Sequence, residues 1–390
     1  MAKSQTHSDE LPLQGYRLIK PIQNALQRLR PLGAERDVAQ NRQLFFDQYL
    51  SLLLLYFFNS TLTSLRSLPK TTHWEKTQKA LGIQPASLGS LSEAQGVFDA
   101  AQVEPILAEL AQQAIPHSQG REAEALKGLT AVDGSLFPAL SRMRWALWQD
   151  DQHRAAKLHL HFEVFKGVPC QATVTPAACS EPAELSRTLE TGRLYVFDRG
   201  YASYELFANV IAAGSSLVGR VKDNTAFEVK EERTISEVAK KAGVIRDVVL
   251  SRLGTSHFKD HWKQDMRLVI VRIDDRDGKV SELWLITDRL DLDADLVALA
   301  YRYRWTVELF FRWLKCILGS RHLVAHSQNG VQLQLYAAMI VSLLIAIRSG
   351  LKPTKRLYEL VQFYLLGWVS DAEFERDLLK LKPVAKKANG

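Results

Sequence analysis

Cysteine is scarce in this sequence, and the few thiols show no pairing pattern. The 390 residues include three cysteines, Cys170, Cys179 and Cys316, an odd number without the spacing of a metal module. Small secreted domains and zinc modules carry more cysteines at short, repeated intervals. The sequence therefore argues against a disulfide framework and predicts that each cysteine packs in a core.

The sequence also lacks a long, purely apolar run that would mark a signal or a membrane span. Residues 1–10 are polar, and residues 49–58 are apolar but too short to cross a bilayer. Residues 331–347 approach the spanning length but include Gln332 and Gln334. We interpret both apolar stretches as buried core helices, and we expect a cytoplasmic protein without membrane contact.

Positive charge is in excess, and it is concentrated in two stretches. The formal net charge is +7; residues 17–42 hold six lysines and arginines against two acids, and residues 301–322 hold five against Glu308 alone. Such surfaces fit a polyanion such as nucleic acid, although solvated helix faces give the same pattern. With 46% hydrophobic residues, the chain has room for two or three domains.

A helical N-terminal domain is predicted over residues 1–125. Prolines separate stretches with apolar periodicity, the longest of them at residues 40–65. Ser90 is predicted to cap a helix, with Glu93 at its third position. A helix, a Ser/Gly turn and a second helix fit either a helix-turn-helix-like unit or a plain helical bundle. We predict DNA binding for this domain, with both interpretations open.

Near residue 126 the pattern changes to the strand and helix alternation of an α/β domain. Residues 129–137 predict a first strand with one acid, Asp133, among apolar residues. Residues 194–197 are an uninterrupted apolar run, typical of a strand buried on both faces, and the run ends at Asp198. The other predicted elements are a hairpin of strands 157–164 and 169–174, helices 181–190 and 204–213, and a strand at 216–221.

A block rich in β-strand residues interrupts this alternation. It contains predicted strands at 244–250, 266–273 and 282–287. We therefore predict an α/β core in two parts, residues 126–224 and 288–350, separated by a β-rich insertion at 225–287. Residues 351–390 are predicted as a C-terminal helical segment with a basic tail.

The second core part contains a helix with two distinct faces, predicted from Tyr301 to Lys315. Tyr301, Arg304, Glu308 and Lys315 lie within one narrow arc, because their offsets are close to whole turns. Apolar residues lie on the opposite side and predict the packing face. The polar face places a single carboxylate between fixed cations, which raises the question of its partner.

Three carboxylates stand on separate core elements: Asp133 on the first strand, Asp198 after the fourth, and Glu308 on the late helix. Acids on the first and fourth strands, with a helix between strands three and four, follow the order of the ribonuclease H-like fold. Three carboxylates that lie close together cannot all stay ionised unless cations lie between them. Two Mg²⁺ or Mn²⁺ ions, which bind oxygen ligands, would supply that positive charge. Taken singly, Asp198 also fits a turn, and Glu308 fits an intrahelical pair with Arg304 or Arg312.

The chain resembles bacterial insertion-sequence transposases of the DDE class, in insertion-sequence family four. That group is marked by Tyr, two residues, Arg, three residues, Glu, six residues and Lys. The matching residues here are Tyr301, Arg304, Glu308 and Lys315. The phrase Asp198-Arg199-Gly200-Tyr201 resembles the second-aspartate motif of the group, and residues 132–135 resemble the first. The resemblance covers about residues 125–350, including the β-rich insertion, and is only loose in the N-terminal part.

The resemblance implies an α/β, ribonuclease H-like enzyme in which Asp133, Asp198 and Glu308 hold two Mg²⁺ or Mn²⁺ ions. It implies DNA contacts for Tyr301, Arg304, Lys315, Arg199 and Tyr201. The implied activity is cleavage at the terminal inverted repeats of a mobile element and strand transfer into target DNA, by a homodimer on DNA.

Several nearby side chains have alternative interpretations. Trp305 and Trp313 fit stacking on an unpaired base, but we predict core packing for both. His159 and His161 share one strand face, where packing or a DNA-facing role is predicted rather than metal binding.

Two rival functions fit the same sequence. A ribonuclease H-like nuclease without strand transfer would carry the same three acids. A non-catalytic DNA-binding derivative of a transposase would lack one of the acids, and none is missing here.

Overall fold

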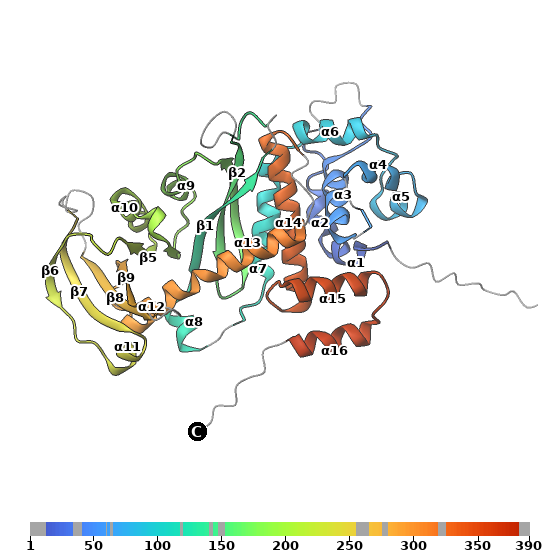
Figure 1. Ribbon diagram of the computed structural model, residues 1–390. Helices are drawn as coiled ribbons and strands as arrows, with labels where there is room; N and C mark the ends of the chain where they lie inside the picture. The colour runs from blue at the N-terminus through green and yellow to red at the C-terminus, as the bar shows by residue number, and fades with distance from the viewer. Residues whose placement is uncertain are drawn as a thin grey trace, which may run out of the picture. The chain divides into compact units, whose positions relative to one another are not determined.

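The chain is described here in a computed structural model (Figure 1). The described residues are 13–33, 41–59, 61–62, 65–117, 120–139, 143–146, 153–254, 265–274, 280–318 and 325–381. The predicted basic tail beyond residue 381 lies outside them, as do all but the first residue of a turn that the run of residues 274–278 predicts. Two compact units divide the chain: residues 1–114 with 313–390 form a helical unit, and residues 115–312 form a sheet unit. The predicted boundaries at 125, 224, 287 and 350 stay predictions.

The helical unit combines the N-terminal helices with the C-terminal ones. α14 (Gln328–Ser349) packs against α3 (Phe46–Phe58), and every residue of α3 is buried. The Ser327 hydroxyl caps α14 by accepting from the Gly330 amide, and Gly350 ends it in the left-handed conformation. The other helices are α1 (Tyr16–Ile19), η1 (Lys20–Ile22), α2 (Gln23–Gln27), η3 (Leu65–Ser67), α4 (Leu68–Thr71), α5 (Glu75–Leu81), α6 (Leu88–Val97), η4 (Ala100–Val103), α7 (Glu104–Gln113), α15 (Lys355–Leu365) and α16 (Asp371–Leu381).

One side chain joins distant segments of the helical unit. The Asn329 side chain donates to the carbonyls of Gln95 and Phe98 at 2.7 Å each, and it accepts from the Ala100 amide at 2.8 Å. α14 has the length and apolar composition of a membrane span, but 89% of its apolar window is buried in this structure. Such burial is typical of a helix in a protein core.

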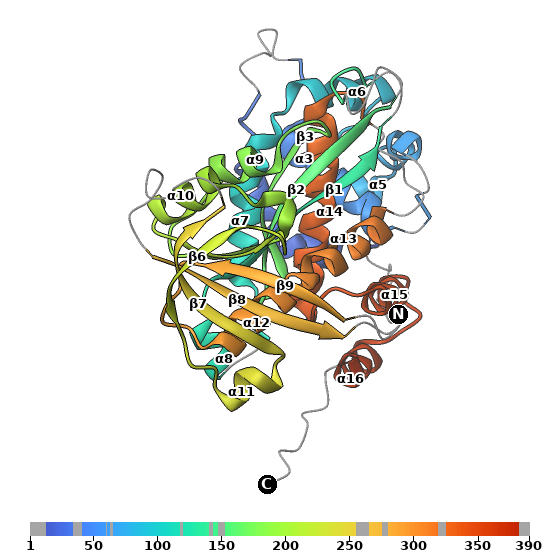
Figure 2. The ribbon, with the colours of Figure 1, turned by 60° about the vertical axis from the view of Figure 1, so that its left-hand side comes forward.

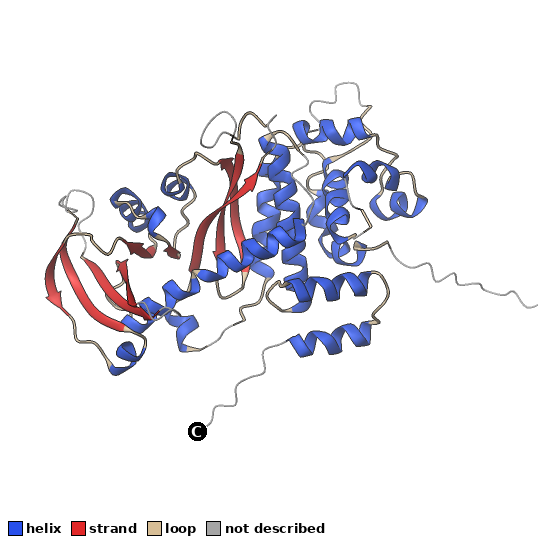
Figure 3. Ribbon diagram, viewed as in Figure 1, coloured by secondary structure: helices blue, strands red, loops and turns tan. Residues whose placement is uncertain are grey.

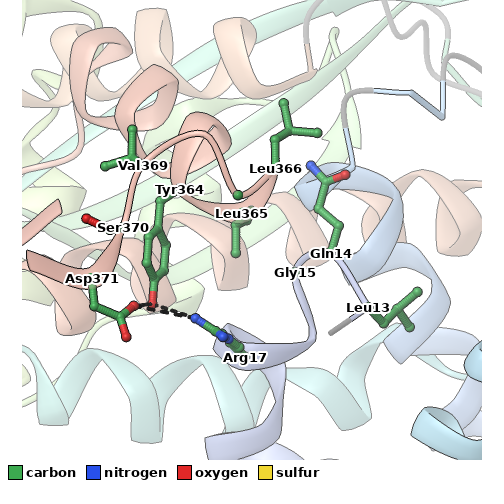
Figure 4. Close-up of a pocket in the computed structure, with 11 residues that line it drawn as sticks. Leu13, Gln14, Gly15, Arg17, Tyr364, Leu365, Leu366, Val369, Ser370 and Asp371 are labelled. Atoms are coloured by element: carbon green, nitrogen blue, oxygen red, sulfur yellow. Dashed lines mark hydrogen bonds and ion pairs between the residues drawn. The ribbon is translucent and has the colours of Figure 1, made fainter. Parts of the chain in front are cut away.

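A cavity of about 420 Å³ lies within the helical unit, between the start of α1 and the segment from α15 to α16 (Figure 4). There the Tyr364 hydroxyl donates to Asp371 at 2.6 Å, and the Arg17 guanidinium donates to the same hydroxyl at 3.1 Å. The predicted cap of α6 needs a correction. Ser87 rather than Ser90 is the N-cap, because the Ser87 side chain accepts from the Ser90 amide.

In the part of the chain that is described, all strands belong to one mixed nine-stranded sheet in the sheet unit (Figure 3). Their order is β3-β2-β1-β4-β5-β9-β8-β7-β6, with β1, β4 and β5 parallel and the other neighbours antiparallel. The strands are β1 (Leu129–Pro138), β2 (Ala155–Glu163), β3 (Val168–Pro176), β4 (Leu194–Phe197), β5 (Ser216–Val221), β6 (Phe227–Glu232), β7 (Val244–Leu253), β8 (Met266–Asp274) and β9 (Val280–Thr287). The fold class is therefore mixed α/β, as predicted.

The later strands extend the same sheet. β9 pairs antiparallel with β5, so strands β6 to β9 continue the sheet edge to edge (Figure 2). β6 and the helix after it were missed in the sequence. The helices of this unit are α8 (Arg121–Ala125), α9 (Glu181–Arg187), η5 (Arg199–Tyr201), α10 (Tyr204–Ala212), α11 (Glu237–Lys241) and α12 (Ala294–Tyr303); α13 (Trp305–Leu318) begins there and runs past Arg312.

The residues of β1 and β4 alternate between the two faces of the sheet. Val132, Tyr195 and Phe197 belong to one buried cluster with apolar residues of α9 and α10. Ala131 and Val196 pair across the strands in the other side-chain phase. Asp133 continues that second phase, so it lies on the face opposite the α9 and α10 cluster.

The predicted helix from Tyr301 to Lys315 is two helices. α12 ends at Tyr303, Arg304 is a turn residue, and α13 starts at Trp305. The Arg304 amide bonds the Tyr301 carbonyl and the Val307 amide bonds the Arg304 carbonyl, which are three-residue rather than four-residue steps. The predicted apolar face of α13 is confirmed, because Val307 and the residues that follow it in that phase are buried.

Candidate active site

Asp133 lies on β1 and Asp198 directly follows the neighbouring parallel strand β4, at the same level of the sheet. β1 and β4 pair in parallel, and their last paired residues are Ala131 and Val196. Each aspartate follows two residues later in extended backbone, so both side chains leave the same face of the sheet. Neighbouring strands lie about 4.8 Å apart, so the fold brings together two acids that are distant in the sequence.

Each aspartate is oriented by a backbone amide of its own segment. Asp133 Oδ1 accepts from the Gly134 amide at 2.9 Å. Asp198 Oδ1 accepts from the Gly200 amide at 2.8 Å and caps η5. The turn interpretation of Asp198 is therefore correct, and the same turn holds the carboxylate at the end of β4.

Glu308 is held by Arg304 across the helix break. The Arg304 guanidinium contacts Glu308 Oε1 at 2.6 Å, with both side chains partly buried. Arg304 is also close enough to Asp133 to favour the ionised form of that carboxyl. The pair of Arg304 with Glu308 considered in the sequence is thus present, although Arg304 precedes α13, and Arg304 acts on both the first acid and the third. The convergence of Glu308 with both aspartates stays a prediction.

Burial gives Asp133 an unusual acidity. Loss of hydration raises the pKa of the Asp133 carboxyl to about 7, and the negative charges of Asp198 and Glu181 push in the same direction. The Gly134 amide and the Arg304 cation oppose this rise in pKa. Burial and the neighbouring carboxylates make ionisation of Asp133 costly. A divalent cation bound among these carboxylates would offset their repulsion and favour the ionised form.

The pH dependence of stability follows from that shift. The folded pKa of Asp133 lies above the value of about 3.9 expected when unfolded. The folded state therefore binds more protons between these values, and the metal-free protein should lose stability as pH rises from about 4 to about 7. The slope should be at most about 1.4 kcal/mol per pH unit, less for solvent screening.

Urea unfolding of metal-free protein at several pH values measures this slope. Asp133→Asn should flatten the curve between about pH 4 and 7, because asparagine does not titrate in this range. Equal slopes for the wild type and the variant would show that Asp133 titrates normally.

Tyr301 and Arg304 lie beside a hollow in the sheet unit. Tyr301 is 9% exposed, and the Arg304 guanidinium carbon lies 5.7 Å from its ring centre. The buried Arg304 Nε has no hydrogen-bond partner, although the other end of the group binds Glu308. The hollow, of about 500 Å³, is lined by both residues, by Arg272, Arg302 and Trp305, and by one acid, Asp295, so arginines outnumber acids in its lining. Its cationic lining and the unsatisfied Nε favour an anionic ligand such as phosphate.

The other predicted DNA-contacting residues differ in exposure. Lys315 is exposed on α13, two turns after Glu308. Arg199 is exposed in η5, whereas Tyr201 is 2% exposed with its ring 5.8 Å from that of Phe197. A DNA contact by Tyr201 would therefore require the η5 turn to move.

The two tryptophans have different environments. Trp313 is buried, donates from Nε1 to the Ser342 hydroxyl at 3.0 Å and packs edge-on against Tyr358, as predicted for core packing. Trp305 is 50% exposed, with the Arg312 guanidinium carbon 5.9 Å from its ring centre. The core-packing prediction for Trp305 is therefore wrong, since the ring stands at the surface beside Arg312.

The two strand histidines are packing residues. His159 Nε2 pairs with the Thr175 hydroxyl at 2.8 Å, and His161 Nε2 pairs with the Thr188 hydroxyl at 3.1 Å. Burial lowers the pKa of His159 to about 4 and that of His161 to about 3, so both rings are neutral at pH 7. Of the described cysteine side chains, Cys170 is buried and Cys179 partly so, and both are free thiols.

A family model described as the transposase DDE domain matches residues 124–344, which is more than half of the chain. The chain belongs to this transposase DDE domain family. It is accordingly a DNA transposase, an enzyme of the polynucleotidyl transferase type, and DDE enzymes of this kind use divalent metal ions.

Relatives of this DDE transposase support the assignment. The chain is 29% identical over 247 residues to a candidate transposase, y4zB, of Sinorhizobium fredii, covering 62% of this chain and 67% of the relative. It is 25% identical over 220 residues to a transposase assigned to insertion sequence element IS5377 of Geobacillus stearothermophilus. This second match spans 56% of each protein, so the chain covers little more than half of that relative.

A solved structure is also similar to the DDE transposase, at low identity. It is the cryo-EM structure of a piggyBac transposase synaptic complex with hairpin DNA, with a TM-score of 0.39 and 12% identity over 97% of this chain and 87% of that one. At this TM-score the likeness carries no argument.

The carboxylate oxygens of Asp133 and Asp198 in this DDE transposase are suitable ligands for hard divalent cations. Two carboxylates that leave the same face of a sheet offer the oxygen ligands that Mg²⁺ and Mn²⁺ prefer. Among the described residues, however, no three His, Cys, Asp or Glu side chains form a metal-binding arrangement. Glu308 is instead paired with Arg304. Any third carboxylate ligand from α13 would therefore have to leave that ion pair.

Sequence reasoning missed Glu181, which it treated only as the start of a helix. Glu181 Oε1 lies 3.3 Å from Lys157 Nζ, and the Glu181 carboxylate adds to the negative field at Asp133. A sequence signal was present, since Glu181 follows the third predicted strand of a core with acids on strands one and four. The position of Glu181 in the sequence does not show that its carboxylate lies near the aspartates.

Proposed function

We propose that this transposase cleaves phosphodiester bonds at the terminal inverted repeats of a mobile element and joins the freed 3′ ends to target DNA. The observation that supports this proposal is the parallel pairing of β1, which bears Asp133, with β4, which ends just before Asp198. Arg304, with its unsatisfied Nε, stands beside them as a phosphate-binding group. The spacing of Tyr301, Arg304, Glu308 and Lys315 supports membership of insertion-sequence family four.

The proposed core is ribonuclease H-like and extends over β1 to β5 with the α12 and α13 helices. The strand order β3-β2-β1-β4-β5, antiparallel and then parallel, supports it. Residues 225–287 would be an insertion, because β6 to β9 follow β5 in sequence and only lengthen its sheet edge. The helical N-terminal segment is proposed as the DNA-binding part.

In this proposal Asp133, Asp198 and Glu308 hold two Mg²⁺ or Mn²⁺ ions. The ions would supply activation of the attacking water or 3′-hydroxyl and stabilisation of the leaving oxygen. The Gly134 and Gly200 amides orient the Asp133 and Asp198 carboxylates. The Glu308 carboxylate is bound to Arg304 and would be released to bind metal. The enzyme would act in the cytoplasm as a homodimer on two element ends.

We propose that DNA binds at the hollow lined by Arg304, the residue that pairs with Glu308. Binding of a phosphate to Arg304 would satisfy its Nε and weaken its hold on Glu308. DNA binding and assembly of the three acids are thereby coupled in the proposal. Lys315, exposed two turns further along α13, would contact a second phosphate.

The activity is tested with the DNA that flanks the gene. Purified protein with Mg²⁺ and flanking DNA should cut at inverted repeats, and pre-cut ends with plasmid should give joined products. Nicking without joining would favour the nuclease, and binding without cutting would favour the non-catalytic derivative.

Arg304→Gln should weaken DNA binding and flatten its dependence on salt. Loss of one phosphate contact reduces the slope of log K against log salt by about 0.9. Affinity measured by fluorescence anisotropy from about 50 to 200 mM salt reports this slope. Arg246→Gln is the matched control, because Arg246 is also ion-paired, to Glu232 at 2.6 Å, but does not line the hollow. An unchanged slope in Arg304→Gln would remove Arg304 from the DNA contacts.

A further inference from the structure

The Glu181 carboxylate is seated against the glycines that follow the two aspartates. A side chain begun at Gly134 would meet Glu181 Oε1 at 2.6 Å, closer than real Cβ atoms approach. A side chain begun at Gly200 would meet Asp198 Oδ1 at 3.1 Å and Glu181 Oε2 at 3.5 Å. One carboxylate thus lies against both β1 and η5, with Oε1 at Gly134 and Oε2 at Gly200.

Backbone conformation does not explain these two glycines. Neither Gly134 nor Gly200 is among the described glycines with positive φ, so other residues could adopt their backbone angles. The space at Gly134 is instead filled by a neighbouring carboxylate. Glycine at this position makes room for Glu181 on the face of the sheet that α9 covers.

A lysine from the adjacent strand compensates part of this charge. Lys157 on β2 lies 3.3 Å from Glu181 Oε1 and donates to the Cys179 carbonyl at 3.1 Å. Both members are partly buried, with side chains 13% and 26% exposed. The pair therefore sits in a fixed geometry where charges interact more strongly than on an open surface.

We propose that Glu181 and Lys157 are positioning residues that set the affinity of the Asp133 and Asp198 pair for divalent cations. Glu181 raises the affinity by adding negative charge and by resting against Gly134 of β1 and Gly200 of η5. Lys157 lowers the affinity and fixes the Glu181 carboxylate against the glycines. This inference rests on the proposed metal site, and it assigns to the site two residues outside the three acids.

Opposite charges predict opposite effects on metal binding. Glu181→Gln keeps the side-chain shape but removes a negative charge, and it should weaken Mn²⁺ binding about tenfold. Lys157→Gln removes a positive charge and should strengthen Mn²⁺ binding several-fold. A pair that only supported the fold would weaken binding in both variants and lower the unfolding temperature in both.

The experiment titrates Mn²⁺ into the metal-free full-length protein and follows free Mn²⁺ by electron paramagnetic resonance. Lys166→Gln is the matched control, because Lys166 pairs with Glu163 at 3.5 Å with a similar exposure of 18%. This control should leave the Mn²⁺ affinity unchanged. In DNA cleavage, Glu181→Gln should raise the Mg²⁺ concentration needed for half-maximal rate and change the rate at saturating Mg²⁺ little.

Asp133→Asn separates failure of this inference from failure of the proposed function. If Asp133→Asn abolishes Mn²⁺ binding but Glu181→Gln leaves it unchanged, the metal site stands and the inference is overturned. If Asp133→Asn leaves Mn²⁺ binding unchanged, the proposed metal site itself is wrong. Shifts in the same direction for Glu181→Gln and Lys157→Gln would also overturn the inference.

Discussion

Asp133→Asn and Asp198→Asn should each reduce DNA cleavage by about a thousandfold or more while DNA binding survives. Asparagine can still accept from the Gly134 or Gly200 amide through its carbonyl oxygen, so the local turns should persist. What each variant loses is one negative charge at the paired strand ends. Cleavage of labelled element ends and gel-shift binding, measured on the same preparations, test the two parts of this expectation.

A matched control separates charge loss at the site from charge loss elsewhere in the sheet unit. Asp265→Asn removes a carboxylate just before β8 that pairs with Lys230 of β6 at 2.6 Å, and it should leave cleavage unchanged. Asp133→Asn should not destabilise the metal-free fold near pH 7, since burial already disfavours the ionised carboxyl there. Cleavage at wild-type rates in either site variant would withdraw that aspartate from the catalytic set.

Much of the sheet was predictable because buried strand positions require apolar residues, which leaves a recognisable pattern in the sequence. The uninterrupted apolar run at Leu194–Phe197 and the alternation in Ala155–Glu163 gave strands with nearly the observed bounds. β6 was missed because Phe227–Glu232 is almost wholly exposed and carries three acids, so no face is marked as buried. Edge strands of this kind depend on their neighbour rather than on their own pattern.

The site was partly predictable for the same physical reason. The abrupt end of a buried strand at Asp198 marked a polar group at the sheet edge, and the structure pairs that strand with the one bearing Asp133. The break at Arg304 was not predictable, because 3.6-residue periodicity continues through the phrase without glycine or proline. Glu181 was missed since its role depends on space at Gly134, which only the packed structure reveals.

Arg267→Met should produce the largest loss of stability, about 3–5 kcal/mol, by leaving Asp247 buried without its partner. Arg267 and Asp247 form two parallel bonds of 2.7 Å, and their side chains are 1% and 3% exposed. Arg267 also donates to the carbonyls of Arg289 and Leu292, just before α12. The ion pair therefore ties the later strands of the sheet to the start of the helix that leads to Arg304.

Urea unfolding at pH 7 measures this loss, and hydrogen exchange locates it. Amides around residues 288–293 should exchange faster in Arg267→Met, because the loop before α12 loses its anchor. Lys230→Met breaks an exposed pair in the same sheet and should cost at most about 1 kcal/mol. The double variant Asp247→Leu with Arg267→Met should recover most of the stability, since no buried charge is left alone. A loss below about 1 kcal/mol in Arg267→Met would show that solvent reaches Asp247 and that the pair does not anchor α12.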